Sequence, residues 1–381
     1  TRKQTYTLMD TISSLSSGIT NILKDSMGII LIIISYPILE KEIALFELET
    51  SLTLYIIAFI CIDFASYWSH RLNHKINVFW NQHIIHHSSE EFNLACALRQ
   101  SISNIIGYNA LFLIPAAIMG VPSEIIIFLS PIHLFGQFWY HTQHIGKLGF
   151  LEYVFVTPSQ HRVHHAINPI YIDKNLSAIF CVWDRIFGTF QEELDDVKPI
   201  YGTLKPVQTW NPIVINFQHF YRLTKDSWYT KKFSDKIKIW FMPTGWRPND
   251  MESIFIYETQ SKKQKKYYPN YNNSDKLIGI FHFICVNIIL TSFLYSFSNL
   301  ESDVKLIYTL IIFLSVFGYT SLMDRYSWAN LFEIFRSLIS LYLIIFLGEL
   351  TFLNLFLYCY LMTSIAVSFF KIIKTKTFLN K

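Results

Sequence analysis

Long apolar stretches separated by polar segments dominate the hydrophobic pattern of the chain. Residues 51–69 contain one charged side chain, Asp63, and are long enough to cross about 30 Å of hydrocarbon as a helix. Apolar runs at 277–297, 305–323 and 335–370 are at least as long, and the last has room for two helices. This pattern predicts an all-α protein with multi-pass transmembrane helices.

Shorter apolar stretches lie between these candidate spans. Residues 27–39 are interrupted by a proline and are too short to cross a bilayer alone, so they predict half of a kinked span or an interfacial segment. The runs at 105–119 and 121–139 are separated by Gly120 and Pro122 and predict a helical hairpin. The total expected is four to seven membrane helices.

The pattern divides the chain into four parts. Residues 1–50 are expected to be an interfacial or partial membrane segment, and residues 51–190 carry the histidine motifs described below. Residues 191–275 are polar and turn-rich, and residues 276–381 are expected to be transmembrane helices. Because the chain starts at Thr1 without methionine, an upstream segment is expected to be missing.

Composition supports a membrane protein. Hydrophobic residues make up 51% of the 381 residues and charged residues 16%, whereas soluble domains carry about a quarter charged residues. The net charge of +4 is small and the basic residues are scattered, which excludes a nucleic-acid partner. The five cysteines lie far apart in apolar sequence and indicate buried thiols rather than disulfides.

Nine of the 13 histidines occur in spaced groups. The groups are His70 and His74 in SHRLNH, His83, His86 and His87 in HIIHH, His141 in WYHTQH, and His161, His164 and His165 in HRVHH. On a helix, side chains three and four residues apart share a face, so each group is expected to present its imidazoles in one direction. Imidazole binds Fe, Zn, Cu and Ni, and nine clustered ligands predict two metal ions.

Four other histidines and two aspartates also enter the interpretation. His144 lies three residues after His141 and is a possible further ligand, whereas His133, His219 and His282 stand alone and are expected to be satisfied by ordinary hydrogen bonds. Asp63 lies two helical turns before the first histidine group, where its carboxylate could orient a ligating ring in the second shell. The alternative is a bond to water or a nearby tyrosine. Asp173 is a second such candidate, and it could instead simply be solvated.

Three segments resemble the fatty acid hydroxylase/sterol desaturase superfamily of membrane di-iron enzymes. They are DFASYWSHRLNHKINVFWNQHIIHHSSEEFNLACALRQS, FWYHTQHIGKLG and TPSQHRVHHAINPIYIDKNLSAIFCVWDRIFGTF. They contain that superfamily's signature boxes, H-x-x-x-H, H-x-x-H-H and H-x-x-H-H. Within the superfamily the chain especially resembles the alkylglycerol monooxygenase family, also through YGTLKPVQTWNPIVINFQH, so the resemblance covers nearly the whole chain.

The resemblance implies membrane helices beneath a cytosolic, histidine-rich cap that holds a dimetal centre. It implies two iron ions, which zinc could replace on overexpression, with O₂ as co-substrate and tetrahydrobiopterin as reductant. The reaction would hydroxylate the ether-bearing alkyl carbon of an alkylglycerol and release a fatty aldehyde and a glycerol derivative. The box ligands correspond to His70, His74, His83, His86, His87, His161, His164 and His165, and a further family histidine corresponds to His141.

One position departs from the family pattern. Lys75 follows the second histidine of the first box, where the animal ether-lipid enzymes carry glutamate. The reductant, a pterin or another electron donor, therefore stays open. The membrane would be the endoplasmic reticulum in a eukaryote or the inner membrane in a bacterium.

Two other functions fit the same motifs. A sterol desaturase or a fatty-acyl or carotenoid hydroxylase shares the boxes and the membrane setting. A non-catalytic metal carrier would place its ligands in the middle of the membrane, whereas these boxes lie just beyond the ends of the predicted spans. The sequence therefore favours an enzyme with a lipid substrate.

Overall fold

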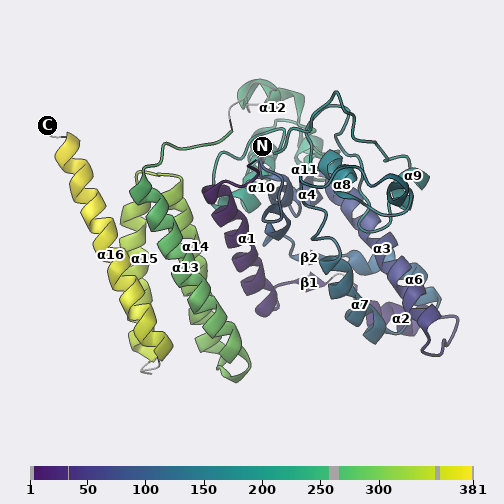
Figure 1. Ribbon diagram of the computed structural model, residues 1–381, viewed down its shortest axis with the longest axis horizontal. Coiled ribbons are helices and arrows are strands. Elements are labelled where there is room, and N and C mark those ends of the chain that lie inside the picture. Colours follow the sequence, from purple (N-terminus) through teal and green to yellow (C-terminus); the bar gives the residue numbers. More distant parts are fainter. Residues whose placement is uncertain (1–3, 33, 257–265, 348–351, 380–381) are drawn as a thin grey trace. The chain divides into compact units, whose positions relative to one another are not determined.

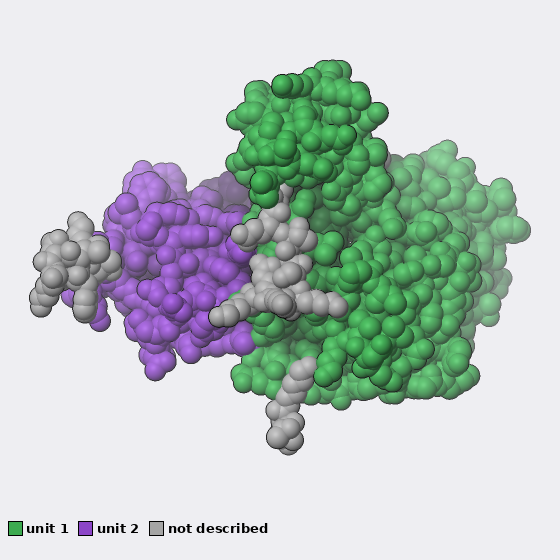
Figure 2. Space-filling view, turned by 90° about the horizontal axis from the view of Figure 1, so that it is seen from above, with its two compact units in different colours: residues 1–6, 28–207, 215–266 green, residues 7–27, 208–214, 267–381 purple. Residues whose placement is uncertain are grey.

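A computed structural model describes residues 4–32, 34–256, 266–347 and 352–379 of the chain. In these residues helices are the main regular structure and turns and loops make up most of the rest; the strands β1 (Leu31–Ile32) and β2 (Ile106–Gly107) are two residues long and pair in parallel. The chain forms two compact units, coloured separately in Figure 2. Unit 1 comprises residues 1–6, 28–207 and 215–266, and unit 2 comprises residues 7–27, 208–214 and 267–381.

Unit 1 contains one long apolar helix and many short ones (Figure 1). Its α-helices are α2 (Tyr36–Ile43), α3 (Leu52–Lys75), α4 (Asn77–Trp80), α5 (Ile84–His87), α6 (Ile114–Ile118), α7 (Ser123–Phe135), α8 (Pro158–His164), α9 (Val182–Ile186), α11 (Phe233–Phe241), α12 (Asn249–Ile254) and, apart from its first turn, α10 (Pro212–Tyr229). Its 3-10 helices are η1 (Cys96–Leu98), η2 (Asn109–Leu113) and η3 (Gly149–Tyr153).

Helix α3 confirms the span predicted at 51–69 and continues it to Lys75. Its first turn is capped by Ser51, whose hydroxyl accepts the N–H of Leu54 at 3.3 Å. Its apolar side chains pack with those of α2, α6 and α7 in one hydrophobic core. Because this packing holds α3 from Leu54 to Ala65, the histidines in its last two turns extend from a rigid support.

The shorter apolar stretches follow the predictions in part. Residues 27–39 form no half-span: β1 occupies part of this stretch and α2 begins directly before Pro37, which suits proline because the first helical turn needs no N–H from it. Residues 109–118 and 123–135 form two short apolar helices, with the turn at Gly120 in the left-handed region at φ 69°. The predicted break between the runs at 105–119 and 121–139 is therefore confirmed.

Unit 2 is a bundle of long helices (Figure 1). It contains α1 (Leu8–Ser26), α13 (Asn273–Ser296), η4 (Phe297–Asn299), α14 (Ser302–Met323), α15 (Ala329–Leu347) and α16 (Phe352–Leu379). Together with α3, the helices α13 to α16 make five in the described residues that are long and apolar enough to cross a membrane. The predicted runs at 277–297 and 305–323 are confirmed, and the run at 335–370 divides into α15 and α16, apart from residues 348–351, which lie outside the described residues.

The core of unit 2 contains a buried charged pair. Glu333 and Arg336 on α15 form an ion pair with exposures of 0% and 1%. Arg336 also donates to Ser315 on α14 at 2.9 Å, and His282 on α13 hydrogen-bonds Tyr360 on α16 at 3.0 Å. Charged groups are costly in a membrane bundle unless they are paired and hydrogen-bonded, so this network links the four long helices.

Candidate metal centre

Nine histidine side chains from four segments of unit 1 meet in its interior. The segments and their histidines are α3 with His70 and His74, the α5 segment with His83, His86 and His87, the loop after α7 with His141, and the α8 segment with His161, His164 and His165. The cap of α8 is Thr157, whose hydroxyl accepts the N–H of Gln160, and Pro158 occupies its first position. The structure thus brings together all nine histidines that their spacing singled out.

The ring nitrogens form two groups, in each of which one nitrogen per ring lies within 4.8 Å of the others. Group 1 contains His70, His74, His83, His87 and His164, and group 2 contains His86, His141, His161 and His165. In group 1 the Nε2 atoms of His70 and His83 are 2.9 Å apart. In group 2 Nε2 of His161 is 2.9 Å from that of His141 and 3.0 Å from that of His165.

Each H-x-x-H-H box contributes to both groups. The first and last histidines of a box lie four residues apart and share a group, as His83 and His87 do in group 1. The middle histidine, His86 or His164, belongs to the other group. The expectation that each box presents its rings in one direction therefore holds for His70 and His74, but it was wrong for the two H-x-x-H-H boxes, because neighbouring helical residues are rotated by about 100° from each other.

The nitrogen positions fit metal ions. Buried Nε2 atoms of His74, His87 and His164 have no hydrogen-bond partner among the described residues, and all three belong to group 1. Buried polar atoms are normally paired, so these orphaned nitrogens need a ligand. In group 2 Nε2 of His161 lies close to Nε2 of both His141 and His165, and one proton on it could be donated to only one of them. A metal ion in each group would accept these lone pairs.

The protonation of these rings also suits metal binding. Burial lowers the pKa of His141 to about 4. Burial, reinforced by neighbouring imidazoles, likewise lowers the pKa of His161 and His165 well below the ordinary range, and the same holds for His83 and His87. Neutral imidazole is the form that ligates a metal, so both groups are ready to bind at neutral pH.

Backbone carbonyls orient several of the rings. Nδ1 of His70 lies 2.8 Å from the carbonyl oxygen of Leu176, and Nδ1 of His164 lies 3.0 Å from that of Lys174. A ring that donates its Nδ1 proton to a carbonyl presents Nε2 as a free acceptor toward the group. The loop around residues 174–176 therefore selects the tautomer of histidines from two different helices.

Asp173 occupies a second-shell position beside group 1. Its carboxylate lies 3.4 Å from Nδ1 of His74 and 2.9 Å from Nζ of Lys75. Burial alone would raise the pKa of Asp173, but the bonds from His74 and Lys75 lower it to about 2. The carboxylate is therefore charged at neutral pH and placed to hold the His74 ring. Lys75, the position that departs from the family pattern, is thereby paired with an acid of this chain.

Sequence reasoning gave no role to Asp184, whose side chain holds the loop around residues 174–176, called the orienting loop below. Its side chain is 1% exposed and accepts the N–H of Leu176 at 2.7 Å, the N–H of Ser177 at 3.0 Å and the hydroxyl of Thr189 at 2.7 Å. Two of these partners belong to the segment whose carbonyls face the histidines. No spacing pattern in the sequence indicates such a loop contact, because it depends on the path of the backbone.

Asp63 has a different partner from the one expected. Its carboxylate lies 2.7 Å from Nε2 of His133 and also accepts bonds from Trp183 Nε1 and the N–H groups of Ile179 and Phe180. Its described hydrogen bonds therefore go to α7 and to the start of α9 rather than to a clustered ring. Asp63 anchors the segment after the orienting loop, and this lone His133 is satisfied as predicted.

The remaining histidines of unit 1 lie outside both groups. His144 is exposed, and its Nε2 is 3.2 Å from the hydroxyl of Thr5, so the structure does not bring this possible ligand to the centre. His219 is buried and lies 3.0 Å from the carbonyl oxygen of Asn77. That bond satisfies it in the way expected of a lone histidine.

Comparisons with known proteins agree with this arrangement. A family model for fatty acid hydroxylase matches residues 55–189. Alkylglycerol monooxygenase from Homo sapiens is 33% identical over 88% of this chain and 75% of that protein, and the Xenopus tropicalis enzyme is 34% identical over 89% and 76%. An ornithine lipid hydroxylase from Rhizobium tropici is 26% identical over 35% of this chain and 41% of that protein. No solved structure matches.

The membrane helices and histidine cluster define an integral, multi-pass membrane protein with a candidate dimetal centre, the class of the membrane-bound metal-dependent oxygenases. The chain belongs to the alkylglycerol monooxygenase family. It is accordingly an O₂-dependent oxidoreductase that acts on a lipid in a membrane, and the predicted function is confirmed at this level. The expected domain boundaries and metal ligands stay predictions.

Proposed function

We propose that this protein cleaves the ether bond of alkylglycerols and that the nine clustered histidines bind two iron ions. The observation that carries the proposal is the division of the rings into two groups of five and four, each made of buried and half-buried side chains. Each group offers enough imidazoles for one ion, and relatives that match over most of the chain bear the name alkylglycerol monooxygenase. Iron, when bound, would supply the redox chemistry that activates O₂.

The reaction balances with a two-electron reductant. One atom of O₂ enters the C–H bond next to the ether oxygen, and the other leaves as water after taking two electrons and two protons. The resulting hemiacetal breaks its C–O bond and yields a fatty aldehyde and a glycerol derivative. Tetrahydrobiopterin is the reductant that we propose, by the resemblance of the chain to its family.

The residues of the chain prepare the site for this chemistry. Phe92 is 0% exposed and lies over the rings of His141 and His165, with centroids 5.7 and 5.2 Å apart. The ring of Tyr140 is 4.2 Å from that of His161. These aromatic side chains exclude water from group 2, which would shield the chemistry of a bound ion from solvent. The carbonyl bonds and Asp173 fix the orientation of the rings in group 1.

The proposal is tested with purified protein loaded with iron. A labelled alkylglycerol should yield fatty aldehyde when O₂ and tetrahydrobiopterin are present, and none when either is omitted. Aldehyde formed with another electron donor but not with the pterin would retain ether cleavage and overturn the choice of reductant. If the iron-loaded protein acts on another lipid but leaves the alkylglycerol intact, the proposed substrate is wrong.

A second candidate function is hydroxylation of a lipid without cleavage. The match to an ornithine lipid hydroxylase over about a third of the chain favours it. The same assay separates the two functions, because hydroxylation at a carbon remote from an ether oxygen leaves a stable alcohol. Recovery of an intact hydroxylated chain, such as that of a fatty-acyl lipid, would support this candidate.

A further inference from the structure

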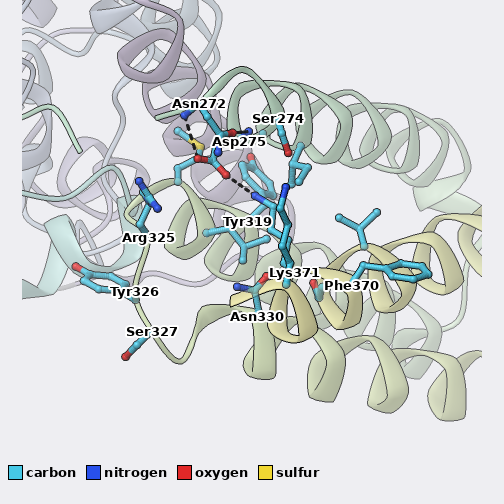
Figure 3. A pocket seen from close by; sticks show the side chains of 17 residues that line it. Asn272, Ser274, Asp275, Tyr319, Arg325, Tyr326, Ser327, Asn330, Phe370 and Lys371 are labelled. Atoms are coloured by element: carbon cyan, nitrogen blue, oxygen red, sulfur yellow. Dashed lines mark hydrogen bonds and ion pairs between the residues drawn. The ribbon is translucent and has the colours of Figure 1, made fainter. Parts of the chain in front are cut away.

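Unit 2 contains a cavity of about 600 Å³ among its long helices (Figure 3). The cavity lies where α13 begins, α14 ends, α15 begins and α16 completes its apolar stretch. These are the ends of candidate membrane spans, so the cavity opens at a membrane–water interface. It is within the size range of sites for small molecules. None of its lining residues belongs to the histidine groups.

The polar side of this cavity is basic. Arg325, Lys371 and Lys374 line it together with one acidic side chain, Asp275, which leaves a formal excess of two positive charges. Figure 3 shows Lys371 directed at Asp275, with which it forms an ion pair. Asp275 is further engaged by the N–H of Asn272 at the start of α13. The acid is therefore already neutralised, and the remaining charge favours an anion.

A buried hydroxyl in the same cavity has no protein partner. Ser368 on α16 is 1% exposed and lines the cavity, and its Oγ atom makes no hydrogen bond to any described residue. A serine on a helix usually donates to the carbonyl four residues earlier or to a neighbouring side chain. The unpaired hydroxyl is an independent sign that a polar ligand completes this site.

Part of the cavity lining is apolar. Ile278, Leu322 and Val367 contribute to its lining, and Phe370 does so while being 70% exposed on the outside of the bundle. The cavity therefore combines a cationic, hydroxyl-bearing end with apolar side chains on membrane helices. A compact soluble anion would use only the first part, whereas an amphiphile would use both.

We propose that this cavity binds the phosphate headgroup of an anionic glycerophospholipid from the surrounding membrane. Arg325 and Lys374 attract the phosphate, Ser368 donates its hydroxyl proton to a phosphate oxygen, and the acyl chains lie along the apolar side chains of α13 and α16. The ligand is a bound lipid of unit 2 and differs from the substrate of the histidine centre, which is a neutral ether lipid in the proposed function.

Native mass spectrometry of the full chain, purified in neutral detergent, tests this site with phosphatidylglycerol, phosphatidylcholine and inorganic phosphate as probes. Phosphatidylglycerol should bind about tenfold or more tightly than phosphatidylcholine. The double variant Arg325→Gln/Lys374→Gln should lose this preference, and Ser368→Ala should weaken binding severalfold. Lys276→Gln is the matched control, because Lys276 lies on α13 at the same membrane end but does not line the cavity.

Three outcomes would overturn the proposal. Equal binding of the two phospholipids would exclude an anionic site, and an equal loss in Lys276→Gln would show a general surface attraction. Binding of inorganic phosphate as tight as that of phosphatidylglycerol would replace the lipid by a free anion. If the double variant does not fold, the preference of the unmodified protein and the Ser368→Ala variant decide the matter.

Discussion

The rings of His87 and His165 stack with their centroids 4.4 Å apart and their planes 25° from parallel, although the two residues belong to different histidine groups. They come from segments almost 80 residues apart and place the two groups side by side. Two ions bound there would therefore be neighbours within one protein interior. The two groups can nevertheless be tested separately, because each has ligands of its own.

The α8 segment offers a matched pair of substitutions for this purpose. His161→Ala and His164→Ala change residues three positions apart, but the first removes a group 2 ring and the second a group 1 ring. Each variant should lose about one of two iron ions per chain, as measured by metal analysis after iron loading, and both should lose activity. His144→Ala should keep both ions, because His144 is exposed and lies outside the groups. Unchanged iron in both α8 variants would contradict the proposed centre.

The Asp173 carboxylate is expected to strengthen metal binding in group 1 because it holds the His74 ring in position. Asp173→Asn is expected to weaken binding of the group 1 ion by about 10- to 100-fold, because the neutral amide holds the imidazole less firmly. Asparagine is the suitable replacement, since the residue has a left-handed φ of 56° that asparagine tolerates. Competition with a chelator measures the affinity.

Lys75→Met provides the control for this variant. Lys75 shares Asp173 with His74, but its side chain is 49% exposed, so its ion pair contributes little. Metal affinity should therefore change only slightly. A loss as large as that in Asp173→Asn would show that the ion pair, rather than the contact with His74, supports the site.

Asp63 should stabilise unit 1 rather than select the metal. Asp63→Ala leaves His133 and Trp183, together with two backbone N–H groups, without their buried acceptor, at an expected cost of about 3 kcal/mol. Thermal unfolding in detergent should show a lower midpoint. Protein loaded with iron at low temperature should retain both ions. Selective loss of one ion at an unchanged unfolding temperature would instead indicate a direct role at the centre.

Two glycines of unit 2 should respond in opposite ways to alanine. A methyl group at Gly318 on α14 would collide with the buried carboxylate of Glu333, which Arg336 and Ser364 hold in place. Gly318→Ala should therefore destabilise the protein by about 1–3 kcal/mol.

At Gly279 on α13 a methyl group would meet its nearest neighbour, Met323, at an ordinary 3.6 Å. Gly279→Ala should leave stability unchanged or raise it by about 0.5–1 kcal/mol, because alanine favours the helix. Thermal unfolding of the two variants side by side measures the difference. Equal destabilisation by both would show that the position of Glu333 is not the cause.

Much of this protein could be predicted from local sequence patterns. A run of apolar residues determines a membrane helix because the bilayer requires every backbone polar group to be bonded within the segment, and α3, α13 and α14 follow that rule. The histidine spacings likewise singled out the nine rings, since residues three or four positions apart approach each other on any helix. Both kinds of signal act over a few residues and are visible without tertiary structure.

The tertiary structure decided how those rings are shared and what supports them. Helix geometry turns the rings of His86 and His87 away from each other, but only the packing of α3, α5 and α8 decides which rings of the other segments join each of them. The bond between Asp63 and His133 joins residues 70 positions apart, and the unpaired hydroxyl of Ser368 is evident only after four helices enclose it. Such contacts depend on the path of the whole backbone, so no local pattern of residues encodes them.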